Sequence, residues 1–181
     1  EDLATGQSKA LTTDGNTRLI NGTFDWAYEE EFDCRDGFRW SPDGKSIAYW
    51  QIDARNIRNF LMINNTDSIY AFNVPVEYPK VGQDPSACKI GVVDVASAKT
   101  KWLAVPGSAV QNYIPRMDWV PNTNNIILQQ LNREQNVSTV YLANTSTNAI
   151  NEVYKETDKA WIDAIDKFDW INNNKAFVLK T

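Results

Sequence analysis

The stretch "FRWSPDGKSIAYW", from Phe38 to Trp50, sets the fold class of this chain. It begins with a polar residue between two aromatic ones, turns through Ser-Pro-Asp-Gly, and ends in a largely apolar run. Pro, Asp and Gly end strands and suit tight turns, and a period of two is typical of a half-buried strand. The stretch therefore predicts a β-hairpin.

The pattern recurs twice without gaps, as "MDWVPNTNNIILQ" over residues 117–129 and "FDWINNNKAFVLK" over residues 168–180. Three further segments predict a second hairpin in each repeat: "DLATGQSKAL" from Asp2, "DVASAKTKWL" from Asp94 and "NTSTNAINEV" from Asn144. Two hairpins per repeat of about 40 to 50 residues are typical of propeller blades. With no helical pattern of about ten residues or more, we predict an all-β chain.

The spacing of the repeats reveals two insertions. Asp94 and Asn144 each precede the next repeat Trp by about 25 residues, whereas Asp2 precedes Trp40 by about 38. The first insertion lies between Asp2 and Trp40, and the second lies roughly between Ile52 and Ser86. Insertions in a repeat array usually form loops on one face, which is often the binding face.

The number of repeats predicts a partial β-propeller. The chain opens inside the outer hairpin of one blade, contains two full four-stranded blades that start near Trp40 and Trp119, and closes with the first hairpin of the next. An open propeller leaves unpaired sheet edges, which natural domains avoid. We therefore expect residues 1–181 to be a segment of one propeller domain within a longer protein.

Composition excludes several functions. The net charge of −5 disfavours a nucleic-acid partner, and no apolar run is long enough to span a membrane. The absence of histidine rules out a Ser-His-Asp or Cys-His system and His-based zinc sites within this segment. We expect the segment to be non-catalytic, with no cofactor and no metal. Cys34 and Cys88 are interpreted as unpaired core thiols, with a single disulfide left open.

The first insertion contains "TFDWAYEEEF", which predicts a short acidic helix capped by Asp25. Glu29, Glu30 and Glu31 fit a solvated acidic cap. They also fit capture of an ammonium group, because paired carboxylates satisfy its donors by charge-assisted hydrogen bonds. A calcium site is a weaker third interpretation, since no other spaced oxygen ligands accompany the run. The aromatic residues around the glutamates would pack the helix or line the pocket: Trp26, Tyr28 and Phe32.

"DWAYEEEF" followed by "RDGFRWSPDGKSIAYWQID" resembles the propeller domain of the dipeptidyl peptidase IV family. The family pattern is Asp-Trp-Val-Tyr-Glu-Glu-Glu, soon followed by Trp-Ser-Pro-Asp/Asn-Gly, and Ala27 stands here in place of the Val. "VEYPKVG", residues 76–82, and "REQN", residues 133–136, resemble family segments in the expected order. The glutamate motif is the specific element, because many propellers share the second one.

The resemblance implies an eight-bladed propeller packed on a C-terminal α/β-hydrolase domain. Such enzymes are serine exopeptidases that release dipeptides with Pro or Ala at the second position. Carried over by position, Glu30 and Glu31 would hold the free α-ammonium of the peptide substrate, and Glu29 is not given that role. The nucleophile elbow and its partners would lie outside this segment, and neither Arg35 nor Arg39 maps onto the arginine that the family places near the substrate.

The resemblance has two further implications. The second insertion, near residues 52–85, is similar to the family's propeller arm, so it would support a homodimer, although an ordinary hairpin extension fits as well. Export to a periplasm or to the cell exterior is the expected location. Two alternative functions stay open: a non-catalytic propeller that binds peptides or proteins, and a relative with acylaminoacyl or tripeptidyl peptidase specificity. A blocked N-terminus needs no ammonium clamp, so the paired glutamates argue against the acyl version.

Overall fold

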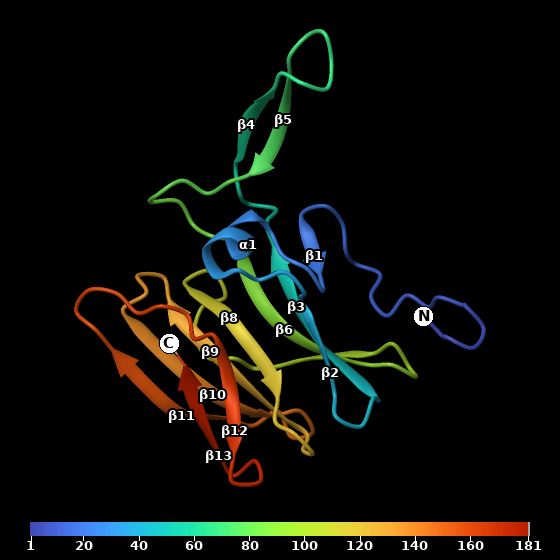
Figure 1. Ribbon diagram of the computed structural model, residues 1–181, viewed down its shortest axis with the longest axis vertical. Coiled ribbons are helices and arrows are strands. Elements are labelled where there is room, and N and C mark those ends of the chain that lie inside the picture. Colours follow the sequence, from blue (N-terminus) through green and yellow to red (C-terminus); the bar gives the residue numbers. More distant parts are fainter. Residues whose placement is uncertain (181) are drawn as a thin grey trace.

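The computed structural model describes residues 1–180 and consists almost entirely of antiparallel sheets (Figure 1). The first sheet contains the hairpin predicted over residues 38–50. Strands β2 (Phe38–Trp40) and β3 (Ser46–Asp53) are joined by a turn in which Gly44 has a φ of +68°. In that turn the Ser41 hydroxyl donates to Asp43 at 2.7 Å. The turn chemistry that the sequence indicated is therefore the chemistry that closes the hairpin.

The first blade runs β2–β3–β6–β7, completed by β6 (Ala87–Asp94) and β7 (Thr100–Trp102). A short strand, β1 (Leu19–Asn21), pairs with the C-terminal end of β3, beside β2. The second blade runs in order through its four strands: β8 (Asn112–Trp119), β9 (Asn125–Asn132), β10 (Val137–Asn144) and β11 (Ile150–Thr157). Two full four-stranded blades are thus confirmed.

The last hairpin follows the same pattern. Strands β12 (Lys167–Ile171) and β13 (Ala176–Lys180) pair antiparallel, and the asparagines that join them, Asn172, Asn173 and Asn174, all have positive φ. Asparagine is one of the few residues with a side chain that tolerates this conformation. The predicted partial β-propeller is therefore confirmed as the fold.

The repeated Trp residues show how successive blades stack. Trp119 of the second blade is 6% exposed, and its indole N–H donates to the carbonyl of Arg39 in the first blade at 3.0 Å. Trp50 makes the reciprocal link, donating to the carbonyl of Ile114 at 2.8 Å. Trp40, by contrast, is 54% exposed. The main core lies between the two blades and includes the buried indoles of Trp50 and Trp119.

One predicted hairpin is wrong. The segment from Asp2 to Leu11 contains no strand in the described structure and instead turns through Gly6, whose φ is +68°. Asp2 caps this turn by accepting from the backbone N–H groups of Ala4 and Thr5. A hairpin needs a partner strand or a packed face to be stable, and residues 2–11 are almost entirely exposed.

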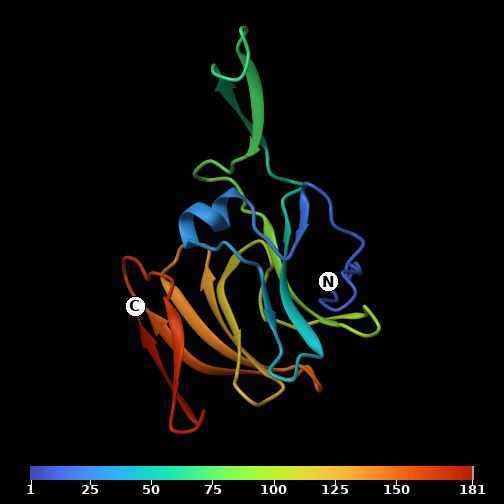
Figure 2. The ribbon, with the colours of Figure 1, turned by 45° about the vertical axis from the view of Figure 1, so that its right-hand side comes forward.

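The two insertions lie at the same end of the blades (Figures 1 and 2). The first forms helix α1 (Trp26–Phe32), which lies across that end. The second forms a two-stranded hairpin, β4 (Asn59–Asn64) and β5 (Phe72–Glu77), which stands away from both sheets in the two views. We call this hairpin the arm. Both insertions are therefore placed as the spacing of the repeats predicted.

Candidate functional site

Helix α1 begins at the residue that the sequence indicated. The Asp25 side chain accepts from the backbone N–H of Tyr28 at 3.1 Å, which satisfies one of the free donors of the first turn. The same carboxylate accepts from the Ser86 hydroxyl at 2.6 Å, and both residues are buried. Burial raises the pKa of the Asp25 carboxyl, while Ser86 and the Tyr28 N–H oppose that rise. The cap therefore also joins α1 to the end of the second insertion.

The buried side of α1 is held by strand β8 of the second blade. Tyr28 is fully buried, and its hydroxyl accepts from the backbone N–H of Ile114 at 3.1 Å. The carbonyl of Phe32 accepts from Arg116 at 2.8 Å, and the Phe32 ring packs against Tyr113 with centroids 5.0 Å apart. Burial raises the pKa of the Tyr28 hydroxyl well above its ordinary value. Tyr28 and Phe32 are thus core residues that fix the helix.

The two cysteines lie under this helix as free, buried thiols. Cys34 Sγ lies 3.4 Å from the carbonyl oxygen of Pro115, and burial raises the pKa of its thiol to about 11. Burial likewise raises the pKa of Cys88 to about 12. The interpretation as unpaired core thiols is confirmed, and such protonated thiols are poor nucleophiles.

The glutamates lie on the outer side of α1. The side chains of Glu29 and Glu30 are 39% and 51% exposed, and Glu31 is exposed as well. Arg35 faces the first two, with Nη1 3.8 Å from Oε2 of Glu29 and 3.8 Å from Oε1 of Glu30. Glu31 makes no ion pair or hydrogen bond within residues 1–180. The helix therefore has a rigid buried side and a row of carboxylates accessible to a ligand.

Trp26 lies on the side of α1 that faces the arm. Its ring centroid is 4.2 Å from that of Tyr78, which follows β5. Among the residues that the sequence grouped around the glutamates, Trp26 alone is only partly buried. It packs the helix against the second insertion and contributes to fixing its position.

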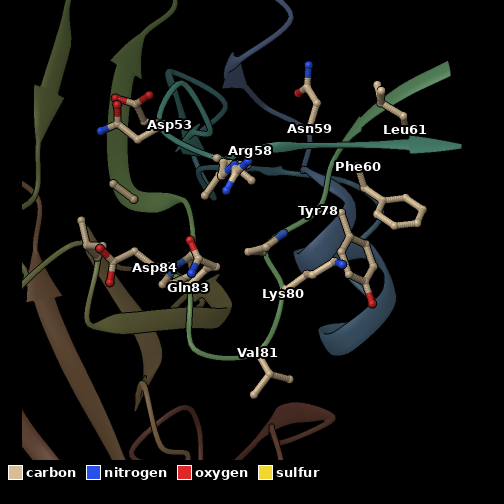
Figure 3. Close-up of a pocket in the computed structure, with 16 residues that line it drawn as sticks. Asp53, Arg58, Asn59, Phe60, Leu61, Tyr78, Lys80, Val81, Gln83 and Asp84 are labelled. Atoms are coloured by element: carbon tan, nitrogen blue, oxygen red, sulfur yellow. The ribbon is translucent and has the colours of Figure 1, made fainter. Parts of the chain in front are cut away.

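A cavity of about 620 Å³ lies at the base of the arm (Figure 3). Arg58, Phe60, Tyr78 and Lys80 contribute to its walls, and Lys80 Nζ lies 5.5 Å from the Phe60 ring centroid. Glu30 and Glu31 are not among its lining residues. This cavity is therefore separate from the row of Glu29, Glu30 and Glu31, which we call the acidic row.

Sequence reasoning identified the acidic row but missed one contact of the helix cap and one contact of the row. Ser86 carried no motif of its own, and its bond to Asp25 spans 61 residues. Arg35 matches no family position, and its contacts with Glu29 and Glu30 arise only in the fold. Within residues 1–180 no three His, Cys, Asp or Glu side chains are arranged to hold a metal ion. No helix of the described segment is long and apolar enough to cross a membrane.

Comparison with known proteins identifies the family. Residues 1–180 match the family described as dipeptidyl peptidase IV (DPP IV) N-terminal region. The chain is 31% identical over 160 residues to inactive dipeptidyl peptidase 10 of Mus musculus, covering 86% of this chain and 20% of that protein. It is 28% identical over 170 residues to dipeptidyl peptidase 4 of Sus scrofa, covering 87% of this chain and 21% of that protein.

A solved structure supports the same assignment. The crystal structure of Porphyromonas gingivalis dipeptidyl peptidase 4 superimposes with a TM-score of 0.81 at 27% identity, covering 89% of this chain and 23% of the other. The chain thus spans about a fifth of the length of the relatives it matches. With the acidic helix, the blade repeat and the family match all in agreement, this chain belongs to the dipeptidyl peptidase IV N-terminal region family.

Proposed function

We propose that this chain is the substrate-recognition segment of a dipeptidyl peptidase IV-like serine exopeptidase, in which Glu30 and Glu31 bind the free α-ammonium of the peptide. One observation carries the proposal: a helix fixed by the buried contacts of Tyr28 and Phe32 presents consecutive carboxylates outward. Three adjacent like charges repel one another, and a cationic ligand would relieve that repulsion.

The proposed chemistry follows from the donors of an ammonium group. It carries three N–H donors, and two carboxylates accept two of them in charge-assisted hydrogen bonds. Because α1 is anchored through its backbone and its buried rings, the carboxylates are positioned before the ligand arrives. Preorganisation of this kind lowers the entropic cost of binding.

Anchoring the N-terminus would also determine which peptide bond is cleaved. If the ammonium is held at a fixed distance from a nucleophile, the second peptide bond lies in line for attack. The 181 residues contain no histidine, so they supply no histidine general base. In this proposal the nucleophile and its base come from an α/β-hydrolase domain in the parent protein, and residues 1–181 belong to one propeller domain of that protein.

The test is substitution of each clamp residue in the full-length protein. Glu30→Gln and Glu31→Gln each replace a carboxylate by a neutral amide of the same shape. Breaking a charge-assisted contact of this kind costs on the order of 2–5 kcal/mol, so kcat/KM for an Ala-Pro p-nitroanilide should fall by about 30-fold or more.

Glu29→Gln is the matched control because it removes the same charge one residue earlier on α1. We expect the change in kcat/KM caused by Glu29→Gln to be less than a third of the change caused by Glu30→Gln or Glu31→Gln. Wild-type rates in both Glu30→Gln and Glu31→Gln would contradict the assignment.

A non-catalytic peptide-binding propeller is the second candidate function. It is favoured by one observation: the relative of 31% identity from Mus musculus is named an inactive dipeptidyl peptidase. Release of dipeptides from a free-amine peptide by the full-length protein would exclude this candidate. Binding of the same peptide without release, lost in Glu31→Gln, would support it.

We further propose that the arm mediates a homodimer. Its strands expose apolar side chains that the rest of the described chain does not cover, among them Leu61, Met62, Ile63 and Phe72. An exposed apolar hairpin of this size typically marks an interaction surface.

A further inference from the structure

Arg35 is shared between the acidic row and the residue that ends the helix. Its Nη1 faces Glu29 and Glu30 at 3.8 Å each, while its Nε lies 3.4 Å from Oδ1 of Asp33. The Arg35 side chain is 60% exposed and that of Asp33 is 86% exposed. One guanidinium therefore contacts three carboxylates, of which only Glu30 belongs to the proposed ammonium clamp.

The backbone explains why Arg35 points to this side. Asp33 caps the C-terminus of α1 in the left-handed conformation, with a φ of 51°, so the chain reverses there. The next residue, Cys34, donates its N–H to the carbonyl of Tyr28 at 3.1 Å and buries its side chain. With Cys34 held inward, the Arg35 side chain is directed outward, alongside the glutamates.

The contacts of Arg35 make the two clamp residues unequal. Glu30 already has a cation beside it, whereas Glu31 has none within residues 1–180. A peptide ammonium that uses both carboxylates must therefore share Glu30 with the guanidinium or displace it. Exposed ion pairs contribute little to stability, so the guanidinium can be displaced.

Asp33 gives the displaced guanidinium a second partner. Because Nε already faces Asp33, the terminal nitrogen can leave Glu30 while the arginine keeps one carboxylate contact. The backbone does not have to move for this exchange, because rotation of the long Arg35 side chain is sufficient.

We propose that Arg35 is an internal cation that competes with the peptide ammonium for Glu30, and that Asp33 accepts the guanidinium when the peptide binds. This inference rests on the proposed function of Glu30 and Glu31. Arg35 then weakens binding of every free-amine substrate, Asp33 strengthens it, and both residues determine affinity for the ammonium without touching the bond that is cleaved.

Opposite effects of two substitutions test the inference in the full-length protein. Arg35→Gln removes the competitor, so KM for Ala-Pro p-nitroanilide should fall about two- to five-fold at unchanged kcat. Asp33→Asn removes the second partner, so KM should rise by a similar factor. In the double variant the Asp33→Asn effect should largely disappear, because no guanidinium remains to be redirected.

The inhibition constant of the free dipeptide Ala-Pro gives an independent measure of ammonium binding. It should move with KM in each variant, whereas the N-acetylated dipeptide should show no such pattern. A loss of structure would instead change kcat and KM together and would not give opposite signs for the two variants.

Arg39 and Asp36 form the matched control pair. Arg39 Nη1 lies 2.9 Å from Asp36, and neither residue contacts the acidic row. Arg39→Gln and Asp36→Asn remove the same charges at nearby positions. They therefore show how much of the change in KM in Arg35→Gln and in Asp33→Asn comes from long-range electrostatics. The inference requires that they change KM by clearly less than Arg35→Gln and Asp33→Asn.

The two proposals fail in different ways. If Glu30→Gln and Glu31→Gln leave kcat/KM unchanged, the ammonium clamp itself is wrong. If those variants lose activity but Arg35→Gln raises KM or leaves it unchanged, only the role of Arg35 is overturned. Strict additivity of Arg35→Gln and Asp33→Asn would overturn it as well.

Discussion

The two insertions lie at the same end of the blades but differ in how they are held. Helix α1 is anchored in the core through Tyr28, which is 0% exposed, and Phe32, which is 4% exposed. The arm stands clear of both sheets and exposes Ile69 at 97% and Tyr70 at 83%. This difference indicates that α1 is a rigid element that positions charges, whereas the arm projects and is available to a partner.

The insertions also meet at two places. The Trp26 and Tyr78 rings are 4.2 Å apart, and the Ser86 hydroxyl donates to Asp25 at 2.6 Å. Both contacts lie at the base of the arm, where the chain enters or leaves the blade. The arm is therefore free along its length but fixed where it reaches the helix.

The largest difference between the two regions should appear in stability. Tyr28→Ala removes a fully buried ring and the acceptor for the Ile114 N–H, so the free energy of opening α1 should fall by about 3–5 kcal/mol. Hydrogen exchange of the α1 amides in the full-length protein measures this opening.

The matched control is Tyr70→Ala, which truncates the same side chain on the exposed arm. It should change the opening of α1 by no more than about 0.5 kcal/mol. Equal protection of α1 in Tyr28→Ala and wild type would show that the helix is not anchored through this residue.

A smaller effect is expected at the cap of α1. Asp25→Ala removes both the contact to Tyr28 N–H and the Ser86 contact and should cost about 1–2 kcal/mol of stability. Asp25→Asn should cost less, because an amide can accept from Tyr28 and donate to Ser86. Thermal unfolding of the two variants gives the comparison.

The cap also predicts a pH dependence. Because burial raises the pKa of Asp25 above its ordinary value of 3.8, the native state binds more protons than the unfolded chain between those two values. The contribution of Asp25 to stability therefore falls as pH rises through this window and stays low above it. Asparagine does not titrate, so the stability of Asp25→Asn relative to wild type should increase over the same window. A pH-independent difference would contradict this account.

The smallest effect on stability is expected in the arm. Ile63 is 67% exposed, so Ile63→Ser should shift the free energy of unfolding by no more than about 0.5 kcal/mol. If the arm mediates a homodimer, the same change should weaken the dimer in sedimentation velocity at unchanged melting temperature of the monomer. A dimer of unaltered strength would show that the arm is not the contact surface.

The sequence predicted the parts of the fold that rest on local chemistry. The hairpin turns at Gly44 and at Asn172–Asn174 were indicated by residues that adopt positive φ, and Asp25 was indicated as a helix cap. The hairpin predicted from Asp2 is wrong for a different reason. Its turn was recognised correctly, but no packed face supports flanking strands. Small polar residues predict a reversal of the chain and do not by themselves predict pairing.

The surroundings of the candidate site were harder to predict. The run of three glutamates stands out as an unusual local pattern, and only the family resemblance assigns the ammonium clamp to Glu30 and Glu31 within it. The bond from Ser86 to Asp25 and the ion pair of Arg35 with Glu30 depend on tertiary placement, which no short motif encodes. Both insertions are rich in aromatic residues. The sequence alone therefore does not show that one insertion is anchored in the core and the other projects, and the burial of each residue is needed to distinguish them.

The most direct test of the ammonium clamp compares a free and a blocked N-terminus in one experiment. The full-length protein should be assayed for kcat/KM on Ala-Pro p-nitroanilide and on its N-acetylated form, in wild type and in the double variant Glu30→Gln/Glu31→Gln. The account predicts strong preference for the free amine in wild type and loss of most of that preference in the double variant. If the double variant keeps the wild-type preference, the free N-terminus is recognised elsewhere, and the central proposal for Glu30 and Glu31 is contradicted.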